Sequence, residues 1–127
     1  MNTIIIAHGS IAASAVQSLE MIVGKTNNFI AIDLLPDDTP EQLHQKVKEY
    51  LSLLDEEPVL FMVDFIGGTP FQVCAQYLSR PNTRCISGFN LPMLIHAAMS
   101  QNIDDIDDLV ANVLQAGMSN IKVFAPD

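Results

Sequence analysis

Residues 59–71, VLFMVDFIGGTPF, combine the signals that decide the fold. Val59–Val63 is an unbroken apolar run of strand length, and Asp64 follows it directly. The pair Gly67-Gly68 then leads to Thr69-Pro70, a dipeptide typical of a helix N-terminus because Pro tolerates the first helical position. This stretch predicts a buried strand, a polar turn and a helix, in that order.

The first ten residues, MNTIIIAHGS, repeat this order. Thr3–Ala7 is rich in β-branched residues and predicts a strand. His8 comes directly after it, and Gly9-Ser10 precedes a stretch with helical periodicity. A second strand, polar loop and helix are therefore expected here.

The rest of the chain continues the alternation. The predicted strands are Thr3–Ala7, Phe29–Leu35, Val59–Val63, Arg84–Ser87 and Ile121–Phe124. The predicted helices are Ile11–Val23, Pro40–Leu54, Pro70–Leu78, Leu91–Met99 and Ile106–Ala116. Thr39 and Thr69 each precede a proline and are expected as helix N-caps, while Gly24 and Gly117 are expected as C-caps.

Alternating strands and helices with short connections predict an α/β fold, doubly wound, with a mainly parallel sheet of order about 2-1-3-4 and helices on both faces. No repeat or linker composition interrupts the chain, so residues 1–127 are expected to form a single domain. In such folds the functional crevice lies at the carboxyl ends of the strands, where strand order reverses. His8 and Asp64 should then lie side by side.

This pair suits nucleophilic chemistry. A neutral imidazole is a nucleophile near pH 7, and a carboxylate bonded to one ring N–H leaves the other nitrogen with its lone pair exposed. Asp64 would orient His8 and offset the positive charge that the ring acquires on phosphorylation. Candidate phosphoryl-binding groups surround the pair, because glycines allow close backbone approach and helix N-termini present N–H groups: Gly9, Ser10, Gly67, Gly68 and Thr69.

Composition narrows the possible partners. The 127 residues are 49% hydrophobic and 17% charged, as expected for a folded globular domain. A net charge of −9 with six Lys plus Arg argues against nucleic-acid binding, which needs a basic cluster. A basic protein partner would be attracted, although the charge can also serve only to keep the protein soluble.

The remaining sequence signals are plain. No apolar run approaches the roughly 20 residues of a membrane span, and the N-terminus lacks the features of a signal peptide, so we expect a cytoplasmic protein. Cys74 and Cys85 lack metal or redox spacing and are expected to be free, buried thiols. His44 lies in a polar helical stretch and is expected to be a solvated surface residue. No group has the spacing of a metal site.

Three segments also resemble a known family: the strand ending in His8-Gly9, LFMVDFIGGTPF at 60–71, and GFNLPML at 88–94. Over essentially its whole length the chain resembles the EIIA component of the mannose family of the phosphoenolpyruvate-dependent sugar phosphotransferase system. The resemblance implies that His8 is phosphorylated, that Asp64 is its hydrogen-bonded partner and that Thr69 contacts the phosphoryl group. No cofactor is implied.

The resemblance also implies partners. The phosphoryl group would come from the histidine phosphocarrier protein and pass to a IIB component, which phosphorylates sugar entering through a membrane IIC–IID pair. Members of the family are typically homodimers that exchange the last strand. Because the sequence stops at Asp127 without a linker, IIB is expected to be a separate protein.

Two alternatives stay open. The phosphocarrier subunit of a dihydroxyacetone kinase shares the fold, although it is not expected to contain the DxxGGTPF segment. A regulatory module, whose phosphorylation state is its output, would use His8 in the same way.

Overall fold

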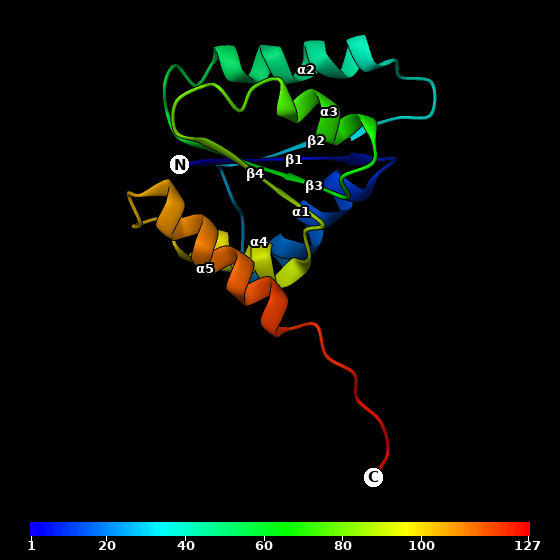
Figure 1. Cartoon of the computed structure of the whole chain (residues 1–127), viewed down its shortest axis with the longest axis vertical. Helices are drawn as coiled ribbons and strands as arrows, with labels where there is room; N and C mark the ends of the chain where they lie inside the picture. Colours follow the sequence, from blue (N-terminus) through cyan, green and yellow to red (C-terminus); the bar gives the residue numbers. More distant parts are fainter.

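The computed structural model describes all residues 1–127 and alternates strands with helices (Figure 1). In chain order the elements are β1 (Asn2–His8), α1 (Ile11–Val23), β2 (Phe29–Leu34), α2 (Pro40–Ser52), β3 (Val59–Val63), α3 (Thr69–Ala75), β4 (Thr83–Ser87), α4 (Leu91–Met99) and α5 (Ile106–Ser119). No helix is both long enough and apolar enough to cross a membrane. The fold is the expected α/β arrangement.

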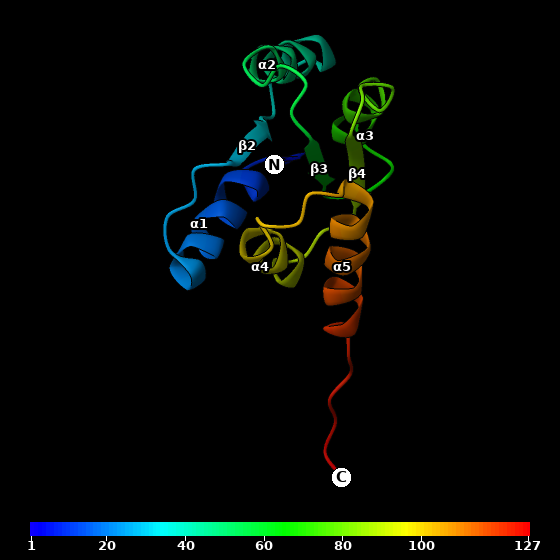
Figure 2. The same cartoon turned by 90° about the vertical axis from the view of Figure 1, so that its left-hand side faces the viewer.

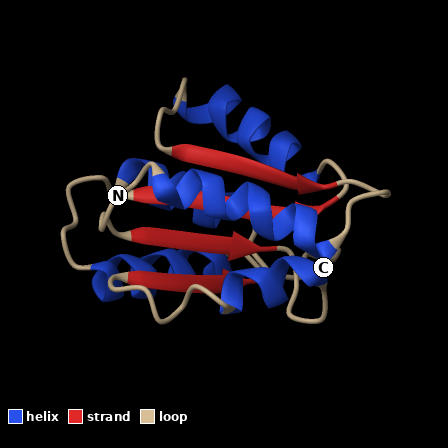
Figure 3. Ribbon diagram, turned by 90° about the horizontal axis from the view of Figure 1, so that it is seen from above, coloured by secondary structure: helices blue, strands red, loops and turns tan.

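The strands form one parallel sheet of order β2-β1-β3-β4, as predicted. In the register of the sheet, Ile4 of β1 pairs with Ile30 of β2 on one side and with Phe61 of β3 on the other. The connection from β2 therefore crosses over β1 to reach β3, which makes the β1–β3 boundary the point where strand order reverses. All strands run in the same direction, so their carboxyl ends share one edge (Figure 3).

The helices cover both faces of the sheet, α2 and α3 on one and α1, α4 and α5 on the other (Figures 1 and 2). Successive side chains of a strand point to opposite faces, so β1 contributes Ile4 and Ile6 to one core and Ile5 and Ala7 to the other. All four are fully buried. The strand sequences are almost continuously apolar because the side chains on both faces of the sheet are buried under helices.

Both cysteines are free thiols, as predicted, but they differ in burial. Cys74 belongs to α3 and is buried in the core between the sheet and the helices α2 and α3, whereas Cys85 on β4 packs against that core and is only half-buried. Burial was therefore predicted correctly for Cys74 and overestimated for Cys85.

Helix starts and stops follow the predicted chemistry in most places. The Thr39 hydroxyl accepts the Gln42 N–H and the Gln42 side chain accepts the Thr39 N–H, a capping box at the start of α2. Gly24 ends α1 with φ +88°, a conformation that glycine adopts at little cost. The predicted ends of α2 and α3 were too late by two and three residues, at Leu54 and Leu78.

Gly117 is not a C-cap, contrary to prediction. It lies inside α5, which continues to Ser119, with Asn120 as its C-cap. A Cβ placed on Gly117 would lie 2.6 Å from Cγ of Met93 and 3.0 Å from Oδ1 of Asn90. The glycine is required because α4 packs closely against α5 at this point, and no turn is involved.

Thr69 is not an N-cap either. It is the first residue of α3, Gly68 occupies the N-cap position, and no side chain caps this helix. The Thr69 hydroxyl makes no hydrogen bond within the chain, in contrast to the Thr39 hydroxyl.

The predicted strand Ile121–Phe124 is not formed within the single chain. Residues 121–127 follow α5 without regular structure and extend away from the body of the molecule (Figures 1 and 2). Ile121, Val123 and Phe124 are 73%, 94% and 89% exposed. The segment is apolar enough for a strand, but no strand of its own chain pairs with it.

Candidate functional site

His8 and Asp64 meet at the carboxyl edge of the sheet, as the topology predicts. His8 is the last residue of β1 and Asp64 follows the last residue of β3. The His8 Nδ1 lies 2.6 Å from Oδ2 of Asp64, and the His8 main-chain N–H donates to the same oxygen at 2.9 Å. The other carboxylate oxygen, Oδ1, accepts the Phe65 N–H at 3.0 Å. One carboxylate therefore holds both the main chain and the ring of His8.

The environment keeps Asp64 ionised. Burial alone would raise the pKa of this carboxyl, but the hydrogen bonds from the His8 main chain, the His8 ring and the Phe65 N–H outweigh burial, and the pKa lies below its ordinary value. An ionised carboxylate can only accept hydrogen bonds, so Nδ1 of His8 must donate. The lone pair of the neutral ring is then on Nε2.

The ring is also accessible. The side chain of His8 is 42% exposed, whereas that of Asp64 is 14% exposed. The more buried carboxylate of Asp64 can therefore orient the imidazole of His8, and the more exposed imidazole can react. This arrangement fits a group-transfer nucleophile better than a buried structural histidine.

The loop after His8 leaves fewer free N–H groups at the start of α1 than the sequence predicted. Gly9 has φ +59°, a conformation that favours glycine, and its N–H donates to the Leu34 carbonyl. Ser10 occupies the N-cap position of α1, but its side chain makes no capping hydrogen bond. Instead, Asp33 at the end of β2 accepts the Ala13 N–H at 3.1 Å. A carboxylate thus already uses one of the N–H groups that we expected to be free for a phosphoryl group.

Gly67 and Gly68 are needed for space, and neither requires a positive φ. A Cβ on Gly68 would lie 2.5 Å from Cε1 and 3.0 Å from Nε2 of His8. A Cβ on Gly67 would lie 2.9 Å from the ring of Phe65. The glycine pair leaves room for the two aromatic rings to lie against the loop backbone.

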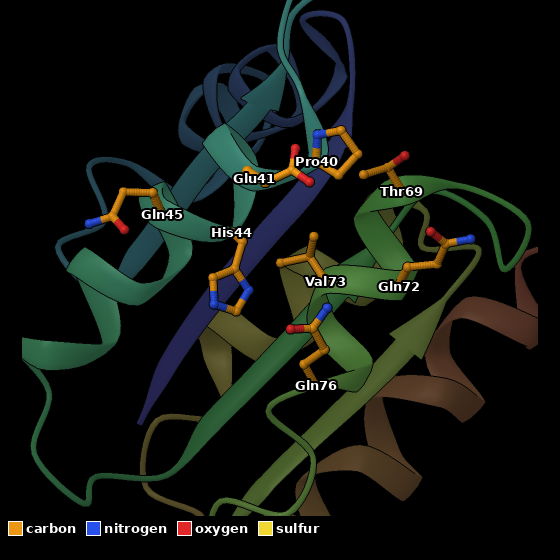
Figure 4. Close-up of a pocket in the computed structure, with 8 residues that line it drawn as sticks. All are labelled: Pro40, Glu41, His44, Gln45, Thr69, Gln72, Val73 and Gln76. Carbon is orange, nitrogen blue, oxygen red and sulfur yellow. The ribbon is translucent and has the colours of Figure 1, made fainter.

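Thr69 follows Gly68 and is the first residue of α3. It lines a cleft of about 390 Å³ between α2 and α3, whose other lining residues are mostly polar (Figure 4). His8 and Asp64 do not line this cleft. His44 does, but it is not the freely solvated residue we expected, because its ring stacks on Tyr77 and its Nε2 lies 3.0 Å from the Tyr77 hydroxyl.

The sequence interpretation missed two residues of the site, Phe65 and Asp33. The Phe65 ring lies beside that of His8, with centroids 5.4 Å apart and planes at 37°. Both residues had a signal in the sequence. Phe65 is an apolar residue directly after Asp64, and Asp33 is the acidic residue at the end of the strand on the other side of β1.

A parallel α/β domain with an oriented, solvent-accessible histidine at its switch point has the geometry that a group-transfer site requires. Comparison with protein families places the chain more narrowly. The EIIA-Man family model, described as the fructose IIA component of the phosphotransferase system, matches residues 2–114. The chain belongs to this family, as the three sequence segments suggested.

Individual relatives agree with this assignment. Over 120 residues the chain is 33% identical to the mannose-specific EIIAB component of Escherichia coli, a match that covers 92% of the chain and 37% of that protein. It is 29% identical over 125 residues to the fructose-specific EIIA component of Bacillus subtilis, covering 97% of the chain and 86% of the relative. The chain thus spans little more than a third of the Escherichia coli relative.

Solved structures show the same fold. The mannose/sorbose-specific IIA subunit from Enterococcus faecalis superposes with a TM-score of 0.92 at 28% identity, over 99% of this chain and 96% of that one. At this coverage the match takes in all four strands of this chain's sheet. A component of the sugar phosphotransferase system is therefore established at the level of the family, which favours this system over the dihydroxyacetone kinase alternative.

Proposed function

We propose that this protein is a phosphohistidine carrier that accepts a phosphoryl group on Nε2 of His8 and passes it to a second protein. The observation that supports this most directly is the 2.6 Å hydrogen bond between Nδ1 of His8 and Asp64, which leaves the Nε2 lone pair available. The donor would be the histidine phosphocarrier protein and the acceptor a IIB component, which serves a membrane IIC–IID pair indirectly. A cytoplasmic location is part of this proposal.

The phosphoryl transfer balances in atoms and charge, and it needs no cofactor. The Nε2 lone pair of His8 forms a bond to phosphorus while the bond from phosphorus to the donor's histidine nitrogen breaks, and that bond's electron pair returns to the donor ring. The His8 ring keeps its Nδ1 proton and acquires a positive charge, which the ionised Asp64 offsets at 2.6 Å. Transfer to the acceptor repeats the step in reverse.

The phosphoryl group would be held by the loops on both sides of the ring. We assign this role to Gly9, Ser10, Gly67, Gly68 and Thr69. Support comes from the Thr69 hydroxyl, which has no partner within the chain, and from Gly68, whose backbone lies close to Nε2. Asp33 opposes strong binding, because its carboxylate offsets the partial positive charge at the start of α1. Weak retention suits a carrier that must release the group.

The partner proteins should present positive charge. Asp33 lies in β2, Asp38 in the loop after it and Glu41 in the first turn of α2. Lys46 is already bound to Asp38 at 3.0 Å. With a net charge of −9, the protein would attract basic partners and accelerate encounter at low ionic strength.

We further propose a homodimer in which the C-terminal segment pairs with the partner. β4 is an edge strand of the sheet, with one side unpaired, and the largely apolar segment 121–124 extends away from the sheet without pairing to any strand of its own chain. Pairing between these two would bury both. Light scattering at micromolar concentration should give a dimer mass for residues 1–127 and a monomer mass for residues 1–120. A monomeric full-length chain would exclude this assembly.

Phosphorylation is tested by labelling. Incubation with radiolabelled phosphoenolpyruvate and the general phosphotransferase proteins should add one acid-labile phosphoryl group to the wild-type protein. His8→Ala should remove the label, and His44→Ala, the matched control, should retain it. Label that survives in a folded His8→Ala protein would refute the assignment.

The same preparation separates a carrier from a regulatory module. A carrier should exchange its label rapidly with both the histidine phosphocarrier protein and IIB. Slow exchange together with tight binding to another protein would favour the regulatory function.

A further inference from the structure

The imidazole of His8 contacts a third group besides Asp64 and Gly68. The Phe65 ring lies 5.4 Å from it, centroid to centroid, with the planes inclined at 37°. This is within the range of separations seen for interacting aromatic pairs. Phe65 is 51% exposed, so the core does not account for its position.

The loop itself holds Phe65 in place. Its N–H donates to Oδ1 of Asp64 at 3.0 Å, which fixes its main chain to the carboxylate that binds His8. Its ring lies over the glycine pair, and a Cβ would come within 2.9 Å of it at Gly67 and 3.1 Å at Gly68. The ring is therefore packed against a backbone that lacks side chains and remains close to His8.

Asp64 alone does not fix the imidazole. A single hydrogen bond at Nδ1 restrains one atom of the ring and leaves rotation of its plane. The Cε1–Nε2 edge lies close to Gly68, and Phe65 occupies the space beside the ring. Rotation of the imidazole would displace Phe65 or move the ring into the Gly68 backbone.

We propose that Phe65 is a positioning residue for His8, which packs beside the imidazole and keeps Nδ1 on Asp64 and Nε2 directed to the phosphoryl donor. This rests on the proposed function of His8 as the phosphoryl acceptor. Phe65 does not touch the reacting atoms in this role. It acts through the orientation and the tautomer of the His8 imidazole.

Phe65→Leu removes the aromatic ring and keeps an apolar side chain of similar bulk. We expect kcat for transfer from the phosphocarrier protein to fall roughly 3–10-fold, the scale of one aromatic pair, with little change in KM. Without donor, the ¹⁵N shifts of the His8 ring should show a larger share of the Nε2–H tautomer. Phe65→Tyr keeps the ring and should restore both measurements.

Gly67→Ala provides a second route to the same perturbation. Its Cβ would contact the Phe65 ring, and the three nearest atoms to it all belong to Phe65. It should reproduce the Phe65→Leu effects even if that variant folds poorly. Ile66→Ala is the matched control, because Ile66 is the next loop residue, apolar and 65% exposed. It should leave the tautomer share and kcat as in wild type.

The outcomes distinguish positioning from docking. A raised KM with unchanged kcat in Phe65→Leu would show that Phe65 only contacts the partner, which overturns the proposal. A lower kcat with an unchanged tautomer share, or no effect at all, would overturn it too. Failure of the proposed function is separate, because wild-type protein would then take no label on His8 and the tautomer measurement would still be available.

Discussion

Asp64→Asn removes the charge of the carboxylate while preserving its size. Asp64 uses both oxygens as acceptors, Oδ2 for two His8 N–H groups and Oδ1 for the Phe65 N–H. An amide has only one acceptor oxygen. If that oxygen faces His8, the amide NH₂ confronts the Phe65 N–H. If the amide is reversed, the NH₂ confronts the His8 main chain and favours a lone pair on Nδ1, the wrong tautomer for reaction at Nε2.

The magnitude follows from the bond that is weakened. A hydrogen bond to a charged group contributes about 1.5–3 kcal/mol, and this one is made by a carboxylate that is 14% exposed. Loss of that stabilisation in the transition state, where the ring becomes positive, corresponds to roughly 10–150-fold in rate. Single-turnover transfer from the labelled phosphocarrier protein measures it directly, beside a thermal melt.

Asp38→Asn is the matched control. It removes the same charge close to the end of β2, where Asp38 accepts the Leu35 N–H and binds Lys46, so any loss of electrostatic attraction to a basic donor appears in both variants. We expect its transfer rate to stay within about twofold of wild type. A folded Asp64→Asn protein that transfers at the wild-type rate would show that the carboxylate is structural, and our account of the site would be wrong.

Three further predictions concern the glycine beside His8, the glycine inside α5 and the pH dependence of stability. Gly68→Ala should keep the melting temperature within a few degrees but reduce labelling at least about tenfold, because its Cβ displaces the His8 ring; equal labelling would refute this. Gly117→Ala should destabilise the protein by about 1–2 kcal/mol in urea unfolding, since crowding against Met93 exceeds the gain in helix propensity, and should leave labelling unchanged. The native pKa of Asp64 is lowered, so its contribution to stability is complete above the unfolded pKa of about 3.9 and is lost as pH falls through the native value. The melting temperature of wild type should therefore fall more steeply than that of Asp64→Asn below about pH 5, and parallel curves would contradict the lowered pKa.

Strand order and the pairing of His8 with Asp64 could be predicted because both depend on local signals and one topological rule. Apolar runs long enough for a strand alternated with helical periodicity, and that pattern allows few sheets. The carboxyl ends of β1 and β3 then had to be neighbours. Residues that end those strands were placed correctly without any information on side-chain contacts.

The errors arose where tertiary packing overrode a local signal. Gly117 has the sequence context of a helix C-cap, but the close approach of Met93 explains the glycine, and nothing near Gly117 in the sequence indicates that contact. Thr69 before Pro70 resembles Thr39 before Pro40, yet only Thr39 caps its helix. The Ile121–Phe124 segment has strand composition, but it extends away from the sheet and pairs with neither edge strand of its own chain.

Phe65 and Asp33 were missed for a different reason. Each acts through a neighbour, Phe65 beside the His8 ring and Asp33 on the Ala13 N–H of α1. Periodicity identifies elements and topology identifies the residues at their ends. The contacts between loops depend on side-chain directions that a single sequence does not specify.

The shared acceptor oxygen of Asp64 has a practical consequence for spectroscopy. Oδ2 accepts the ring N–H and the main-chain N–H of the same residue, at 2.6 and 2.9 Å. A change in charge on the ring alters the electron density of that oxygen, and the amide proton of His8 responds through its own hydrogen bond. The backbone resonance of residue 8 should therefore shift on the phosphorylation proposed for His8, and the reaction could then be followed in real time on uniformly ¹⁵N-labelled protein without a radioactive donor or a modified side chain.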